Sequence, residues 1–227
     1  MFKLTLNSLL ARKIRLALTT FAVVLGVSFV SGSFILADSL RAVFDKIAVE
    51  IAGPDWIQVR GVETIQGDPF SRPVVTQQIV EQIGSSEGVY GAEGVIQGFP
   101  RISFEETLIK PLGGAPTLAF NFDEERAELT GFETIEGKAP SNGEAMVDID
   151  TAQKYGISVG DSISIRSLQP EEQFTVSGIT RWGQDNGGGA VFVLVDTPTA
   201  QRLFNYPDSY LAVTVAALPG VEESELA

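Results

Sequence analysis

The stretch LALTTFAVVLGVSFVSGSFILA, residues 16–37, decides how the rest of the chain is organised. It contains no charged side chain. As a helix it would measure about 33 Å, enough to cross a hydrocarbon core about 30 Å thick. Basic residues precede it, namely Lys3, Arg12, Lys13 and Arg15. The positive-inside rule therefore predicts a transmembrane helix with a cytoplasmic N-terminus and residues 38–227 outside the membrane.

Residues 1–15, MFKLTLNSLLARKIR, place apolar side chains at helical spacing with the basic residues beside them. This pattern predicts an amphipathic helix on the cytoplasmic face of the membrane. The alternative is the start of a signal peptide. Because the apolar core exceeds the usual 7–15 residues and Ile35-Leu36-Ala37 lacks a small-x-small cleavage site, we expect a retained anchor.

One face of the predicted transmembrane helix carries small side chains within an arc of about 60°. We call this set the small-residue stripe: Thr19, Ala22, Gly26, Ser33 and Ala37. Small residues allow a second helix to approach closely in lipid, so the stripe predicts packing against partner helices. The alternative is that its hydroxyl groups bond carbonyls of their own helix.

The helical pattern continues beyond the membrane. Apolar residues recur three or four positions apart until Gly53-Pro54, which is typical of a helix end. They predict an amphipathic stalk, about 20 Å long, with a stripe formed by Leu40, Val43, Phe44, Ile47 and Ile51.

The composition of the remaining chain excludes several functions. Residues 38–227 hold all 29 acidic residues and 12 of the 16 basic ones, giving a net charge of 12 − 29 = −17. A body so acidic argues against nucleic acid as a partner. The sequence has no cysteine and no histidine, so thiolate, Ser-His-Asp and imidazole-metal chemistry are excluded. It also lacks GxxxxGK[ST], and we expect no cofactor and no catalytic residue.

The pattern after the stalk is α+β. Residues 55–104 predict a strand–helix–strand unit whose helix, 73–87, begins at Pro73. The middle, 105–189, predicts short strands and turns, including a strand at Ala145–Ile149 and a helix at Thr151–Tyr155 closed by Gly156. From Ala190 an apolar strand precedes a helix capped by Asp196 or Thr197. Residues 218–227 then predict the start of a further helix.

Three polar segments are candidate sites. Asp148 and Asp150 are expected to be solvent-facing acids, since no calcium-loop pattern follows them. Asp123-Glu124-Glu125 and Glu128 are expected to begin a helix. GQDNGGG, residues 183–189, predicts a flexible hairpin tip that could contact a partner. The possible partner loop comprises Trp182, Asn186, Gly187, Gly188 and Gly189.

Several segments together resemble the N-terminal part of MacB-type, FtsX-like ABC transporter permeases. They are SLLARKIRLALTTFAVVLGV, GPDWIQVRG, EGKAPSNGEAMVDIDTAQKYGISVGDSISI, FTVSGI and AVFVLVDTPTAQRLF. The resemblance implies a mixed α/β lobe split between 54–104 and 190–227, with 105–189 as an inserted β-rich lobe. It also implies a second permease copy and a cytoplasmic ATPase as partners, with ATP-driven motion passing along the stalk. The family's helices 2–4 are absent from this sequence, so we expect the front part of a permease.

Two alternatives come from other functional classes. A single-pass, membrane-tethered binding module would have the same anchor and domain. A membrane-anchored hydrolase would need acids such as Asp148 or Asp150 as its catalytic groups.

Overall fold

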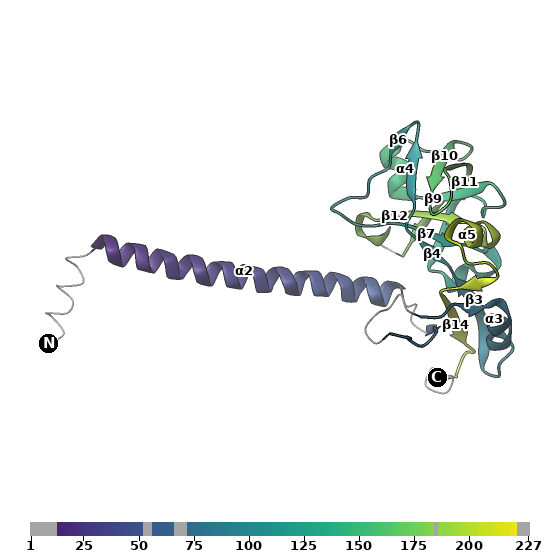
Figure 1. The fold of residues 1–227 in the computed structure, drawn as a ribbon, viewed down its shortest axis with the longest axis horizontal. Helices are drawn as coiled ribbons and strands as arrows, with labels where there is room; N and C mark the ends of the chain where they lie inside the picture. The colour runs from purple at the N-terminus through teal and green to yellow at the C-terminus, as the bar shows by residue number, and fades with distance from the viewer. Residues whose placement is uncertain (1–12, 52–55, 66–71, 184–185, 222–227) are drawn as a thin grey trace. The chain divides into compact units, whose positions relative to one another are not determined.

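The computed structural model describes residues 13–51, 56–65, 72–183 and 186–221. The chain divides near residue 48 into two units, and each is described by itself. In the first unit and slightly beyond it, helix α2 runs unbroken from Lys13 to Ile51 (Figure 1). These 39 residues contain no proline that could interrupt the helix. The unbroken helix confirms the prediction that it continues to Ile51. The predicted amphipathic helix falls mainly on residues 1–12, outside the described residues.

The second unit contains a small antiparallel sheet with the strand order β1-β14-β3. Its strands are β1 (Trp56–Val59), β14 (Ala212–Ala217) and β3 (Val89–Val95). Helix α3 (Gln77–Gly84) packs against β3 and β14, as Figure 1 shows. The helix begins at Gln77 and not at Pro73 as predicted, because β2 (Val75–Thr76) pairs with β13 (Ser209–Tyr210) and holds its residues extended.

A nine-stranded mixed sheet forms the rest of this unit, in the order β4-β7-β12-β9-β11-β10-β5-β6, with β8 pairing β11. Pairs β7/β12 and β9/β11 are parallel. The strands are β4 (Gln97–Gly98), β5 (Arg101–Phe104), β6 (Thr107–Leu108), β7 (Thr117–Asn121), β8 (Phe132–Gly137), β9 (Glu144–Asp148), β10 (Ser162–Arg166), β11 (Glu172–Trp182) and β12 (Val191–Val195).

Backbone hydrogen bonds assign some strands to a different sheet from the one expected from the predicted lobes. Strands β4, β5 and β12 were expected in the split lobe, but they belong to the nine-stranded sheet. The reason is clearest for β12, whose five residues are all buried. A strand that is apolar on both faces belongs inside a sheet that is covered on both faces, and β12 lies inside this sheet, between β7 and β9. The division into two lobes stays a prediction.

Short helices follow two of the central strands. The second begins as predicted, whereas the first begins at Ile149, two residues before the predicted Thr151. Helix α4 (Ile149–Tyr155) starts after β9 with Asp148 as its N-cap and ends at Gly156, whose φ is 72°. Helix α5 (Thr197–Phe204) starts after β12 with Asp196 as its N-cap. A side-chain oxygen at this position accepts a free backbone N–H of the first turn, so each strand-to-helix transition is fixed by an aspartate.

The core of the nine-stranded sheet is apolar and well buried. Phe174, Val176 and Ile179 of β11 are at most 6 % exposed. Gly178 of the same strand lies opposite Gly137 of β8. A Cβ at Gly178 would stand 2.7 Å from the Glu136 carbonyl oxygen, so only glycine permits this close approach of the two strands.

Candidate functional site

The apolar part of α2 is the first candidate site. Residues Lys13–Ile35 are long and apolar enough to cross a membrane, and none of that window is buried against other residues. On the small-residue stripe, the Thr19 hydroxyl donates to the Arg15 carbonyl at 3.0 Å, and the Ser33 hydroxyl donates to the Phe29 carbonyl at 2.9 Å. Both hydroxyls therefore bond within their own helix, while Gly26 has no neighbour within 4 Å of its Cβ position.

The rest of the stripe and the stalk are described less fully. Ala22 and Ala37 are exposed along α2. The backbone of the stalk residues is helical as far as Ile51. The side chains predicted to form the apolar stripe of the stalk lie outside the described residues: Leu40, Val43, Phe44, Ile47 and Ile51.

The possible partner loop is a packed corner in the structure. Asn186–Gly189 form the short 3-10 turn η3. Asn186 and Trp182 are 4 % and 6 % exposed, and the backbone N–H of Trp182 donates to Asn186 Oδ1 at 3.1 Å. A Cβ at Gly187 would meet the Phe192 ring at 2.5 Å. Buried contacts thus hold Asn186 and Gly187 of the predicted flexible tip, whereas Gly183 and Gly188 are exposed.

Asp148 is fully buried and not solvent-facing, so that expectation was wrong. Its Oδ1 accepts from the Thr151 N–H at 2.9 Å and from Asn186 Nδ2 at 3.0 Å. Its Oδ2 accepts from the Phe192 N–H at 2.9 Å. This carboxylate joins β9, α4, η3 and β12, and its fixed partners give it a structural role. Asp150 lies in the first turn of α4 and is exposed.

The acidic segment around residue 124 begins a helix, as expected, although the helix is the 3-10 element η2 (Glu124–Leu129). The Asp123 side chain accepts from the Glu125 N–H at 3.0 Å and caps it. Glu124, Glu125 and Glu128 are exposed. Across the described ranges, no group of three acidic side chains is arranged to hold a metal ion.

A contact between the two sheets was missed by the sequence analysis. Asn121 at the end of β7 is 5 % exposed. Its Oδ1 accepts from the Ile96 N–H at 2.7 Å, and its Nδ2 donates to the Gly94 carbonyl at 2.8 Å. The same Nδ2 reaches Glu93 Oε1 at 3.3 Å. One amide thus links the nine-stranded sheet to β3, and no local sequence signal marks it.

Glu93 is the electrostatically unusual group of this contact. Burial raises the pKa of its carboxyl to about 7, and the negative charge of Asp123 adds to the effect. The Arg126 guanidinium acts in the opposite direction. Charged forms are disfavoured where water is excluded and few donors replace it, so Glu93 exchanges a proton near neutral pH.

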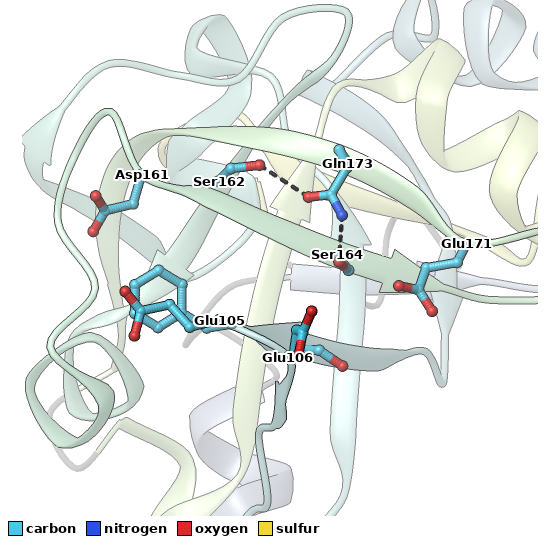
Figure 2. A pocket seen from close by; sticks show the side chains of 9 residues that line it. Glu105, Glu106, Asp161, Ser162, Ser164, Glu171 and Gln173 are labelled. Atoms are coloured by element: carbon cyan, nitrogen blue, oxygen red, sulfur yellow. Dashed lines mark hydrogen bonds between the residues drawn. The ribbon is translucent and has the colours of Figure 1, made fainter.

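An open groove lies on the outward face of β5, β10 and β11 (Figure 2), with a volume of about 720 Å³. Its floor includes Ser162, Gln173 and Ser164, which are joined by hydrogen bonds of 2.9 and 2.6 Å. Glu105 and Glu106 form the two-residue turn between β5 and β6, and both have positive φ, 47° and 63°. The alternation in RISF and SISIR could have predicted the outward face, but not the pairing that builds the groove.

Comparisons with known proteins fit this architecture. The family model described as MacB-like periplasmic core domain matches residues 16–227. The periplasmic region of MacB from Actinobacillus actinomycetemcomitans is similar, with a TM-score of 0.57 at 10 % identity, covering 78 % of this chain and 82 % of that one. The extracellular domain of the noncanonic ABC-type transporter YknZ from Gram-positive bacteria gives a TM-score of 0.54 at 10 % identity, covering 75 % and 88 %.

No curated protein matches the sequence. At 10 % identity the two solved structures establish the fold alone. The family model carries more, since it covers all of the chain except residues 1–15. The chain therefore belongs to the family of proteins that contain a MacB-like periplasmic core domain.

Proposed function

We propose that this chain is part of a permease subunit of an ABC transporter, and that its domain outside the membrane couples ATP-driven motion to the handling of a substrate or partner there. Membership of the MacB-like family supports the transporter class. The observation that carries the coupling role is the unbroken helix Lys13–Ile51.

Only the first part of α2, Lys13–Ile35, is apolar enough to span a membrane. The remaining 16 residues to Ile51 extend the same helix by about 24 Å. Consecutive backbone hydrogen bonds make a helix stiff along its axis, so a displacement at one end is passed to the other. The basic residues before the span support a cytoplasmic N-terminus and an extracytoplasmic domain.

The partners are inferred from the family and from the helix. We assign ATP hydrolysis to a separate cytoplasmic ATPase, which membership of the MacB-like family supports. The small-residue stripe is assigned to packing against helices of a second permease copy or half. Gly26 supports this use, because its Cβ position is open and a neighbouring backbone could approach there.

The test interrupts the helix beyond the span. Proline at Val43 removes one helical hydrogen bond and costs about 3 kcal/mol locally, whereas Val43→Ala keeps the helix. The chain has no cysteine, so Asp150→Cys gives a unique spin-label site on the exposed start of α4. In nanodiscs with the co-expressed ATPase, we expect ATP to change the label-to-label distance in the parent and in Val43→Ala.

Val43→Pro should abolish that change while membrane insertion, co-purification of the ATPase and its basal ATP hydrolysis are retained. The proposal is overturned if Val43→Pro preserves the ATP-dependent distance change. It is also overturned if no ATPase co-purifies with the chain, which is what a single-pass tethered binding module predicts.

A further inference from the structure

Two asparagines of the chain precede a glycine, and the structure places them in opposite surroundings. Asn142-Gly143 lies in the loop between β8 and β9, where both residues are exposed. Asn186-Gly187 lies in η3, where Asn186 is 4 % exposed. The combination is chemically reactive, because glycine has no Cβ to keep its backbone nitrogen away from the side-chain amide of the preceding asparagine. The surroundings therefore decide which of the two asparagines reacts.

The reaction joins the backbone nitrogen of the glycine to Cγ of the asparagine. A C–N bond forms between these atoms, the C–N bond of the side-chain amide breaks, and the glycine N–H proton leaves with that nitrogen as ammonia. One water molecule then opens the resulting five-membered imide to aspartate or isoaspartate. Because the first step needs the two atoms in contact, it requires a peptide plane that can rotate and a carboxamide that is free to turn.

The Asn142-Gly143 peptide meets both requirements. Residues 141–144 form a β-turn, in which the Glu144 N–H donates to the Ser141 carbonyl at 2.8 Å and Gly143 has a φ of 78°. Among the described residues, no hydrogen bond holds the Asn142 carbonyl, the Asn142 side-chain amide or the Gly143 N–H. Turns of types I and II share the closing hydrogen bond and differ by rotation of this central peptide. The Cβ position at Gly143 has no neighbour within 4 Å, so packing does not oppose the rotation.

The Asn186-Gly187 peptide meets neither requirement. Asn186 Oδ1 accepts from the Trp182 N–H at 3.1 Å, and Asn186 Nδ2 donates to Asp148 Oδ1 at 3.0 Å. Turning this carboxamide would break both buried hydrogen bonds. A Cβ at Gly187 would stand 2.5 Å from the Phe192 ring, so the glycine is packed as well. Reaction at this asparagine therefore requires local unfolding of the corner.

We propose that Asn142 is a site of spontaneous covalent modification in the folded protein, where it becomes aspartate or isoaspartate, and that Asn186 is protected from the same reaction. The inference is independent of the proposed transport function. Conversion adds one negative charge to the loop before β9. The isoaspartate form also adds one bond to the main chain of a turn whose Gly143 carbonyl accepts from the Thr175 N–H at 3.0 Å. This form should hold the turn less tightly against β11.

The test follows both asparagines by peptide mapping while the full chain is incubated in detergent micelles at mildly alkaline pH. Trypsin places them in separate peptides, Ala139–Lys154 and Trp182–Arg202. Replacement of the amide NH2 by OH raises the mass of the peptide, and chromatography separates the isoaspartate form from the aspartate form. In the folded chain we expect Asn142 to convert at least about tenfold faster than Asn186, which reacts only from locally opened molecules.

Two controls separate the effect of the fold from that of the local sequence. In guanidinium chloride the two asparagines should convert at rates within about threefold of each other, because both precede glycine. Asn142→Gln keeps an amide but needs a larger ring for the same reaction, so this variant should lose the modification in the first peptide. Conversion of Asn142 no faster than that of Asn186 in the folded chain would overturn the proposal. A tenfold difference that persists in guanidinium chloride would also overturn it, since the local sequence would then set the rates.

Discussion

Asp148 and Glu93 are two carboxylates withdrawn from water in different regions, and they differ in the number of hydrogen bonds that they accept. Asp148 accepts three hydrogen bonds, from Thr151, Asn186 and Phe192, at the corner where β9, α4, η3 and β12 meet. Glu93 receives one long contact, 3.3 Å, from the Asn121 amide between the two sheets. The comparison teaches that hydrogen-bond donors, and not burial alone, decide what a withdrawn carboxylate does: three donors let Asp148 tie four elements together, whereas burial raises the pKa of Glu93.

The largest expected effect comes from removing the carboxylate of Asp148, which accepts three hydrogen bonds. Asp148→Ala leaves two buried N–H groups and the Asn186 amide without their acceptor, and we expect a loss of about 3 kcal/mol in the free energy of unfolding. The measurement is urea denaturation of the full chain in detergent, followed by tryptophan fluorescence, because Trp182 lies in this corner.

Asp150→Ala is the matched control for this prediction. Asp150 is two residues away, also acidic, and exposed in the first turn of α4. Its loss removes only a favourable charge near the helix N-terminus, worth about 0.5 kcal/mol. If both variants lost the same free energy of unfolding, the three hydrogen bonds of Asp148 would not be the source of its contribution to stability.

The second prediction concerns Glu93 and the pH dependence of stability. Its pKa in the folded protein, about 7, is raised above the ordinary glutamate value of 4.5. The folded state therefore holds the proton more tightly, and this stability is fully present below about pH 4.5 and lost as pH rises through 7. The full difference corresponds to about 3 kcal/mol, and partial exposure to water reduces the expected loss to about 1–2 kcal/mol.

Glu93→Gln keeps the shape and removes the titration, so the variant should lose less stability than the parent between pH 4.5 and 7.5. Thermal melts of the full chain across this range measure the difference. Glu87→Gln, an exposed glutamate just before β3, is the control and should follow the parent. If Glu93→Gln follows it as well, the carboxyl of Glu93 does not respond to pH in the way inferred.

The sequence predicted the features that depend on neighbouring residues. The length of α2, the cap at Asp196, the Gly156 end of α4 and the buried strand Val191–Val195 all follow from local spacing. These succeed because helix caps and apolar runs are determined within a few residues.

Features that depend on distant pairing could not be predicted. Asp148 was expected to be a solvent-facing acid before a helix. It is buried because β12 and the turn η3, from about 40 residues away, pack against its carboxylate. The Asn121 contact has the same origin, since it depends on which strands become neighbours.

The smallest expected effect has the opposite sign of pH dependence and comes from Glu144 at the start of β9. Hydrogen bonds from the Ser141 hydroxyl and from Lys138, with a further one from the Ser141 N–H, lower the pKa of its carboxyl, against a small opposing effect of burial. Here the charged form is favoured in the folded state. This stability is present above the usual pKa of a glutamate and is lost as pH falls through the lowered value.

Lys138 is largely exposed, with 66 % of its side chain accessible, so solvent screening limits the effect of Glu144→Gln to a few tenths of a kcal/mol. The variant should be slightly less stable than the parent at pH 7, and this difference should shrink as the pH falls through the lowered pKa of Glu144. Glu93→Gln should instead reduce the difference in stability between acidic and neutral pH. Comparing their melting curves over the same pH series separates the two cases. Donors around Glu144 make its charge stabilising, and the shortage of donors around Glu93 makes its charge costly. A parallel response of the two variants would contradict the view that donor number governs the difference.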